Sequence, residues 1–344
     1  MKQVGKERRQ RKTKSEDMME QIQKIFQERG SKALEIARKE ILQEKVECKE
    51  AREALTYFMT EYWHDVARPA LLSLVCEAVG GNPEITTPIA VPMILISGAI
   101  DIHDDIIDQS EVKDGRPTVL GKFGRDIALL VGDALLFKGL TLLNESGEKG
   151  ISTKKLRTIV ELINEMFFEL GDAEALELGF RGRIDVTPQE YLDVVRTKAA
   201  DVEAHTHISA ILGNGSKEEV EALARYGRFL GMLIILRDDW IDILDVEETR
   251  HRTKNECLPL PVLYALQDHH ATSKLHLLLR KEKISKKDVE ELVRITSKIG
   301  GMKRLRQYME SLVEDALSEL EIVKYKKSEL ELLARAMIVG LEGH

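Results

Sequence analysis

The spacing of apolar residues along the chain is that of amphipathic helices. Between residues 15 and 60, apolar residues such as Met18, Ile22 and Ile25 recur at helical spacing, and the pattern resumes after a break predicted at Gly30. Further helices are predicted near residues 69–79, 88–109, 124–143, 152–178, 188–212, 217–246, 258–268, 286–299, 301–322 and 327–341. The sequence contains no alternating strand pattern of useful length, so we expect an all-α fold.

The widest apolar arcs lie in the middle of the chain. The helices predicted at 88–109, 124–143 and 217–246 are apolar around much of their circumference, which is typical of the centre of a helical bundle. Lys and Arg dominate residues 1–14, so we expect a disordered, solvated tail there. We find no linker in the remainder, and we expect residues 15–344 to form a single domain.

Composition restricts the classes of function. Of the 344 residues, 43% are hydrophobic and only 8 are proline, which fits a helical protein with a substantial core. The net charge of −8 argues against nucleic acid as the main partner. The cysteines are scattered without a Cys-x-x-Cys pair, so the cytoplasm is the simplest location. The uncharged run 85–100 is shorter than the roughly 20 residues of a membrane span, so we expect a buried core helix and no membrane span.

Two segments carry the same arrangement of aspartates. At about 100° per residue, Asp104, Asp105 and Asp108 lie at about 0°, 100° and 40° around their helix and share one stripe. The second segment places its carboxylates in the same relative positions, at Asp238, Asp239 and Asp242. Each segment follows an apolar stretch on a helix predicted to be central.

Carboxylates on one stripe of an apolar helix repel each other and are costly to bury without partners. Mg²⁺ resolves this conflict because it takes oxygen ligands and binds carboxylates together with substrate phosphates. Two such stripes facing each other predict a site for several Mg²⁺ ions and a diphosphate, whose charge the ions neutralise as the C–O bond ionises. The alternative is a solvated acidic face. Two copies of the motif on central helices favour the metal site.

At these motifs the chain resembles the trans-isoprenyl diphosphate synthase (polyprenyl synthetase) family over residues 67–266. The resemblance is carried by His-Asp-Asp-Ile-Ile-Asp at 103–108, Gly-Arg-Pro-Thr at 115–118, Lys-Phe-Gly at 122–124, Gly-Asp-Ala-Leu-Leu at 132–136 and Asp-Asp-Trp-Ile-Asp at 238–242. It implies the all-α isoprenoid synthase fold, a helical bundle around a central cavity, and a homodimer. It also implies that the six aspartates bind Mg²⁺ and an allylic isoprenoid diphosphate, and that diphosphates are contacted by Arg68, Lys113, Arg196 and Lys198.

The sequence departs from the family's pattern at the site for the second substrate, isopentenyl diphosphate. Asp65 stands where the family has a lysine, Ser97 where it commonly has a histidine, and Asp114 where it has the second of two arginines. An anion facing Asp65 and Asp114 would be repelled. The glycine- and lysine-rich loop after the second motif is also replaced, and Arg252 or Lys254 is a candidate for its missing cation.

Three functions are compatible with these residues. The first is a prenyl diphosphate synthase with an altered second-substrate site, which ionises the allylic diphosphate, lets an alkene attack the cation and then loses a proton. The second keeps the ionisation and lacks that co-substrate, as in a terpene cyclase or a prenyltransferase with a different acceptor. The third is a non-catalytic partner subunit, although two complete aspartate motifs argue against it because their carboxylates are costly to retain. We favour the first.

A small residue near the first motif predicts where the hydrocarbon tail lies. In enzymes that resemble this chain, a small residue one turn above the motif leaves room for a long tail. Ala99 occupies that position, five residues before Asp104, and the neighbouring Ile100 is not aromatic. We therefore expect the tail to run past Ala99 and Ile100 towards Ile96.

Overall fold

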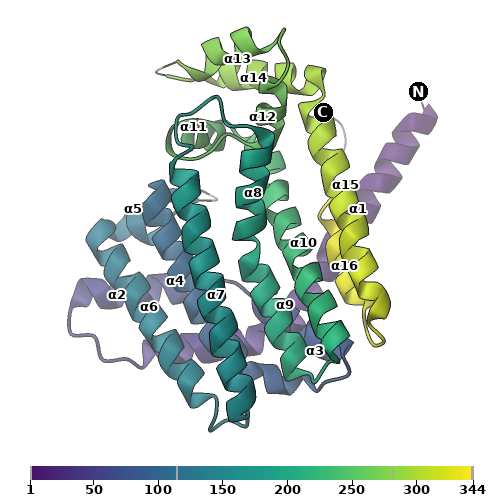
Figure 1. Cartoon of the computed structure of the whole chain (residues 1–344). Coiled ribbons are helices and arrows are strands. Elements are labelled where there is room, and N and C mark those ends of the chain that lie inside the picture. Colours follow the sequence, from purple (N-terminus) through teal and green to yellow (C-terminus); the bar gives the residue numbers. More distant parts are fainter. Residues whose placement is uncertain (1, 114, 282, 342–344) are drawn as a thin grey trace.

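The computed structural model is built almost entirely of helices (Figure 1). It describes the backbone of residues 2–113, 115–281 and 283–341, and the side chains of these ranges from residue 16 onward. In this part of the chain the strands are β1 (Val112–Lys113) and β2 (Arg116–Pro117), which pair antiparallel. The expected all-α fold is confirmed.

The helices form a bundle, and shorter helices lie across one of its ends (Figure 1). The first helices are α1 (Lys2–Leu42), α2 (Lys49–Tyr57), α3 (Ala67–Ala78), α4 (Thr87–Asp108), α5 (Val119–Phe123), α6 (Arg125–Glu145) and α7 (Thr153–Leu178). The later ones are α8 (Pro188–Lys198), α9 (Ala200–Leu212), α10 (Lys217–Asp242), α11 (Val246–Asn255), α12 (Leu260–Leu266), α13 (Thr272–Leu279), α14 (Lys286–Ile299), α15 (Gly301–Glu319) and α16 (Ser328–Ala336). Short turns of other helix types are η1 (Phe58–Tyr62), η2 (Pro83–Thr86) and η3 (Leu320–Ile322). In Figure 1, α8 and α9 follow each other end to end between α7 and α10, and α12 to α14 lie at one end of the bundle.

Helix α4 lies in the core of the bundle. Its first half is buried from Ile89 to Ile96 among side chains of α1, α2, α6 and α9. The stretch Pro83–Asp108 is long and apolar enough to cross a membrane by composition, but 72% of its most apolar window is buried inside the protein. Helix α4 is therefore a buried core helix, as the sequence predicts. The first aspartate motif lies at its C-terminal end.

Glycines allow α6 to lie directly against α4. A Cβ atom at Gly139 would come 2.8 Å from Cγ1 of Ile96 and 3.0 Å from the carbonyl oxygen of Pro92. A Cβ atom at Gly132 would come 2.5 Å from Nε2 of His103. These distances are shorter than van der Waals contact, so a larger residue at position 139 would push the helices apart and one at position 132 would displace the imidazole of His103. The close approach holds the end of α4, and hence the first motif, against α6.

The first helix differs from its prediction at Gly30. Helix α1 is continuous from Lys2 to Leu42, so Gly30 does not break it. A Cβ atom at Gly30 would lie 2.1 Å from the carbonyl oxygen of Val66, and glycine is needed there for close packing and not for a turn. Residues 2–14 form the first turns of α1, and their side chains lie outside the described residues. The division of the chain at residue 15 stays a prediction.

Two of the predicted helices are divided in the structure. The helix expected at 188–212 is split at Ala199 into α8 and α9, and the helix expected to reach residue 246 ends at Asp242. Asp245 then accepts hydrogen bonds from the backbone N–H groups of Glu247 (2.8 Å) and Glu248 (3.1 Å), which is an N-cap that starts a new helix. This new helix, α11, lies next to both aspartate motifs.

Candidate active site

The first motif forms a cluster of carboxylates with a residue from another helix. Asp104 and Asp108 lie on α4 and Glu174 lies on α7, and each offers an oxygen atom within 4.8 Å of the others. All three side chains are half-buried, so a cation can reach them from solvent. Mg²⁺ favours such a set of oxygen ligands. Sequence reasoning missed Glu174, because it is far from the motifs in the chain and only the packing of α7 brings it to α4.

Asp105 has a different environment from its neighbours. Helix α4 ends at Asp108, and the left-handed φ of 58° at the next residue, Gln109, turns the chain into the β1–β2 hairpin. The hairpin returns Lys113 to the motif, with its Nζ 2.7 Å from Oδ1 of Asp105 and 3.6 Å from Oδ2 of Asp104. Burial raises the pKa of Asp105 to about 7 despite this cation. Lys113 therefore lies at the first motif, and its expected contact with a diphosphate stays a prediction.

The pKa of Asp108 is also raised. Arg181, between α7 and α8, places Nη2 3.2 Å from Oδ1 of Asp108 and donates a hydrogen bond to the carbonyl of Ile107. Burial and the neighbouring charge of Asp104 raise the pKa of Asp108 to about 8. The cations of the protein therefore do not balance the carboxylates fully, and a divalent cation fits this charge set.

The two predicted cations on α8 have different positions. Lys198 places Nζ 2.8 Å from Oε1 of Glu174 and also pairs with Glu177. Arg196 is exposed, and its backbone carbonyl accepts a hydrogen bond from Arg228. Residues two positions apart on a helix point in directions about 200° apart, so only one of these side chains can face α7. The structure brings Lys198 to the carboxylate cluster and leaves Arg196 away from it.

The second motif lies at the end of α10 and is held by internal hydrogen bonds. Asp239 accepts from Nη1 of Arg252 (2.5 Å) and the hydroxyl of Tyr191 (2.8 Å) through Oδ1, and from the backbone N–H of Leu260 (2.9 Å) through Oδ2. Asp242 Oδ2 also accepts from Nη1 of Arg252, at 3.0 Å. The sequence predicts Asp239 as a metal ligand; in the structure its carboxylate accepts hydrogen bonds from three donors of the protein, and its role toward a metal stays a prediction.

The other two aspartates of this motif are more accessible. The side chain of Asp242 is 23% exposed, and burial raises its pKa to about 7. Asp238 is exposed on α10 and interacts with its surroundings. Of the two candidate cations after the motif, Arg252 reaches it and Lys254 is exposed. Asp238 and Asp242 are thus the more solvent-accessible aspartates of the second motif.

Helix α11 links the two motifs. His251 places Nε2 3.2 Å from Oε1 of Glu256 and 3.3 Å from the hydroxyl of Ser110, which lies two residues after the first motif. The hydrogen bond and charge of Glu256 raise the pKa of His251. The next residue, Arg252, contacts the second motif. The ends of α4 and α10 therefore meet across one short helix.

The residues of the expected second-substrate site are engaged by one another. Asp65 accepts backbone hydrogen bonds from Ala67 (2.9 Å) and Arg68 (3.1 Å) at the start of α3. Arg68 pairs with Asp65 at 3.0 Å and with Asp201 of α9 at 2.8 Å. Ser97 is buried on α4. Residue 114, which the sequence predicts to repel the second diphosphate, lies outside the described residues. The guanidinium of Arg68 is thus neutralised by two carboxylates of the protein.

The expected hydrocarbon pocket residues lie on α4. Ile96 and Ala99 are buried, and Ile100 is partly buried against the same core cluster. Because Gly139 packs against Ile96, one wall of this region is the backbone of α6. All three residues precede Asp104 on α4 and belong to, or pack against, the same core cluster.

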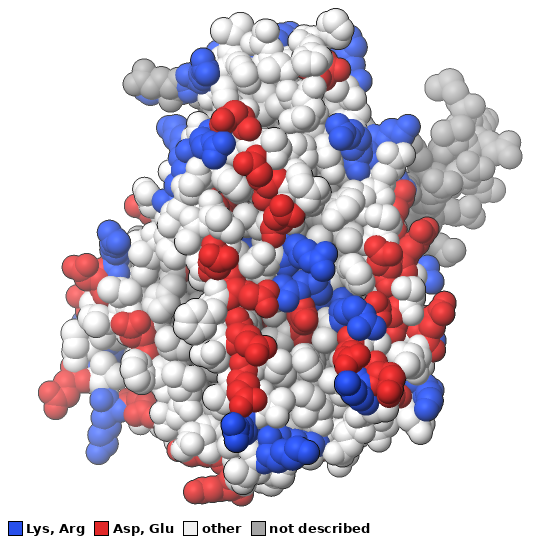
Figure 2. Space-filling model, viewed as in Figure 1, with Lys and Arg blue, Asp and Glu red and all other residues white. Residues whose placement is uncertain are grey.

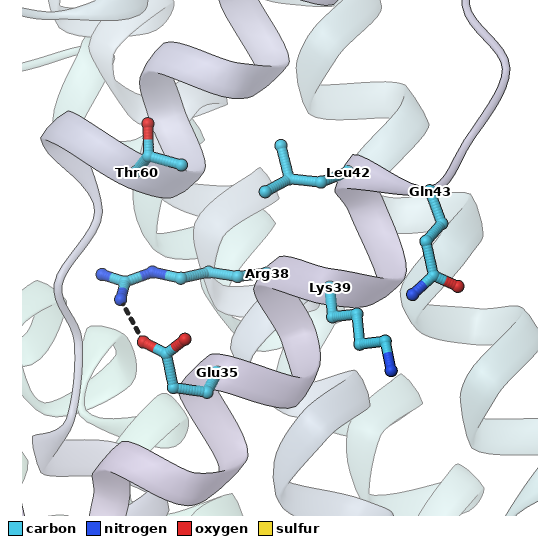
Figure 3. Close-up of a pocket in the computed structure, with 6 residues that line it drawn as sticks. All are labelled: Glu35, Arg38, Lys39, Leu42, Gln43 and Thr60. Carbon is cyan, nitrogen blue, oxygen red and sulfur yellow. Dashed lines mark hydrogen bonds and ion pairs between the residues drawn. The ribbon is translucent and has the colours of Figure 1, made fainter.

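Two surface features lie outside the motifs. Acidic side chains run along the face of α7, where Glu161 and Glu165 are exposed (Figure 2). A pocket of about 410 Å³ lies between α1 and η1, and Figure 3 shows its Arg38 directed at Glu35. Arg38 also donates to the carbonyl of Met59, at 2.7 Å. Neither feature contains a residue of the two aspartate motifs.

Comparison with known proteins agrees with this arrangement. The family model described as polyprenyl synthetase matches residues 50–296, which include both motifs, α7 and α11. The chain belongs to the polyprenyl synthetase family. It is 32% identical over 275 residues to a short chain isoprenyl diphosphate synthase of Methanothermobacter thermautotrophicus, covering 77% of this chain and 79% of that one.

Further relatives support the same assignment. A geranylgeranyl diphosphate synthase of Methanosarcina mazei is 30% identical over 260 residues, which cover 75% of this chain and 79% of that one. The crystal structure of geranylgeranyl pyrophosphate synthetase from Pyrococcus horikoshii superposes with a TM-score of 0.81 at 26% identity, covering 92% of this chain and 98% of that one. This member of the polyprenyl synthetase family is therefore an enzyme of the prenyltransferase type.

Proposed function

We propose that this polyprenyl synthetase family member ionises an allylic isoprenoid diphosphate with the help of several Mg²⁺ ions and transfers the prenyl group. The observation that carries the proposal is the half-buried cluster of Asp104, Asp108 and Glu174, whose oxygen atoms lie within 4.8 Å of one another. Mg²⁺, when bound, would neutralise the leaving diphosphate. Asp238 and Asp242 of the second motif are the further candidate ligands.

The cations of the protein have a matching role in this reaction. Lys113 and Lys198 each lie within reach of the carboxylate cluster, at 3.6 Å from Asp104 and 2.8 Å from Glu174. As the diphosphate arrives, these ammonium groups can donate hydrogen bonds to its oxygens and stabilise the negative charge that develops on ionisation.

The prenyl chain would lie along α4. We assign Ala99, Ile100 and Ile96 to its contact surface, because they lead from the first motif into the apolar core. Tail length is then restricted by the side chain at position 99, which faces a densely packed interior. The backbone of α6 at Gly139 sets the opposite wall.

The site expected for the acceptor of the prenyl group differs most from the family's pattern. Arg68, which the resemblance assigned to the second diphosphate, is already neutralised by Asp65 and Asp201. Isopentenyl diphosphate would therefore be a poor acceptor, and a cyclase reaction or a different acceptor is the second candidate function. A non-catalytic partner subunit is disfavoured, because the first motif keeps its carboxylates together.

We further propose that the enzyme works as a homodimer in the cytoplasm. Phe137 and Leu130 on α6 and Phe168 on α7 are 71%, 60% and 74% exposed, which is unusual for large apolar side chains. A second copy of this chain is the natural partner for such a surface. Light scattering on wild type and the Phe137→Asp variant tests this, and a wild-type monomer would contradict it.

A direct assay tests the reaction. The protein is incubated with Mg²⁺ and C10, C15 or C20 allylic diphosphates, with and without isopentenyl diphosphate, and the products are identified by mass spectrometry. Longer diphosphates that form only with the co-substrate select the synthase. Hydrocarbons or alcohols formed without it select the cyclase or an alternative acceptor. Turnover by an Asp104→Asn, Asp108→Asn double variant equal to wild type would overturn the proposed metal site.

A further inference from the structure

Arg252 is an unusual residue in the second aspartate motif. Its side chain is 6% exposed, and its Nη1 lies 2.5 Å from Oδ1 of Asp239 and 3.0 Å from Oδ2 of Asp242. Its Nε donates to the carbonyl of Cys257 (3.1 Å), and its Nη2 donates to the hydroxyl of Tyr191 (3.0 Å). The guanidinium is thus fixed in one position by the protein on several sides.

The partners of Asp239 leave it little capacity for another ligand. Oδ1 accepts from Arg252 and Tyr191, Oδ2 accepts from the backbone of Leu260, and the side chain is 2% exposed. A Mg²⁺ ion requires ligand oxygens at roughly 2.0–2.1 Å in octahedral geometry. It would have to displace at least one of these donors and lie close to the positive charge of Arg252, which repels it.

The three carboxylates clustered at the first motif are more exposed than Asp239. Asp104 and Asp108 are 29% and 17% exposed, and Glu174 is 21% exposed. Their cations come from flexible lysine and arginine side chains that reach in from the hairpin, α8 and the α7–α8 segment. Those side chains can swing away when an ion binds, whereas Arg252 is buried with its partners.

We propose that Arg252 is a resident cation of the second motif, which takes the place of a metal ion at Asp239. The metal ions of the enzyme are then held by Asp104, Asp108 and Glu174, with Asp242 and Asp238 as the only possible contributors from the second motif. Asp239 is a positioning residue that holds α10, α11 and α12 together. This inference rests on the proposed function, because it concerns the same metal site.

The test counts metal ions without measuring activity. Mn²⁺ is titrated into the purified full chain, and free Mn²⁺ is followed by its electron paramagnetic resonance signal. Asp239→Asn should leave the Kd for Mn²⁺ within about twofold of wild type, whereas Asp108→Asn should raise it at least about tenfold. Arg252→Met should bind one additional ion, because it leaves the carboxylates of Asp239 and Asp242 without their cation. Arg250→Met, which removes an arginine from the same helix, is the control and should bind like wild type.

A second variant covers the possibility that Arg252→Met does not fold. The double variant Arg252→Met, Asp239→Asn removes one charge of each sign and avoids an uncompensated buried carboxylate. It should bind the wild-type number of ions. Loss of an ion in this variant, or a Kd in Asp239→Asn raised as much as in Asp108→Asn, would overturn the inference. An Asp108→Asn variant that binds Mn²⁺ like wild type would instead contradict the proposed function.

Discussion

Replacing Gly30 with alanine should destabilise the protein, even though alanine is the better helix former. The new Cβ atom would lie 2.1 Å from the carbonyl oxygen of Val66 and 2.9 Å from its Cα, so backbone would have to move by about 1 Å to restore contact distance. Overpacking costs about 1–3 kcal/mol, and a Cβ atom 2.1 Å from a backbone oxygen belongs at the upper end of this range, at about 3 kcal/mol, while the helix propensity of alanine returns at most about 1 kcal/mol. We expect a net loss of about 2 kcal/mol in the free energy of unfolding.

The expected change can be measured by thermal unfolding. With an unfolding entropy of about 2.1 cal/mol/K per residue, a chain of 344 residues should lose about 3 °C in Tm for 2 kcal/mol. Circular dichroism at equal protein concentration gives this value. Ser31→Ala is the matched control, because it changes the next residue of α1 without adding an atom, and it should stay within about 0.5 kcal/mol of wild type.

The same variant has a functional consequence. Val66 lies between Asp65 and Arg68, so its displacement should loosen the pairs that Arg68 forms with Asp65 and Asp201. If Gly30→Ala proves as stable as wild type while Ser31→Ala is neutral, then α1 does not approach the segment before α3 closely. The backbone of Val66 would then not hold Arg68 in its position between Asp65 and Asp201.

Three further predictions concern the site. Ala99→Phe should reduce kcat/KM for the longest accepted diphosphate at least about tenfold and favour shorter ones, and unchanged selectivity in product analysis would argue against the proposed tail position. Glu174→Gln should raise the Mg²⁺ concentration for half-maximal turnover at least about tenfold, which a magnesium titration measures; an unchanged requirement would remove Glu174 from the site. Because the pKa of His251 is raised by Glu256, their interaction is present below the ordinary histidine pKa of about 6.5 and is lost as the pH rises through the higher folded value. Hydrogen exchange corrected for intrinsic rates should therefore show α11 less protected at high pH, by no more than about 1 kcal/mol, and a His251→Gln variant should lack this difference.

Much of the fold could be read from residue patterns because helices are local structures. The predicted core helices 88–109 and 124–143 match α4 and α6 closely, since their apolar arcs and the bounding Gly and Pro residues act within a few turns. Gly30 was misjudged for a physical reason. A glycine that breaks a helix and a glycine that admits a neighbouring backbone are identical in sequence, and only the position of Val66 separates them.

The candidate site shows the same division. Spacing alone placed Asp104 and Asp108 on one stripe, because helical periodicity dictates it. Glu174 was beyond such reasoning, since it is brought to the motif by α7, which is distant in the chain. Spacing also treated Asp239 like its neighbours, whereas Tyr191, Arg252 and the backbone of Leu260 converge on it from three separate segments.

The sequence by itself determined most of the helices, the two aspartate motifs and the family, because each depends on residues close together or on a pattern that can be aligned. Tertiary structure decided which carboxylates share a cation, which are already neutralised, and where Arg68 and Lys198 direct their charge. The physical reason is that ion pairing and burial depend on distance in space. Distances between segments such as α4, α7 and α11 are set by packing of the whole chain and not by any local pattern.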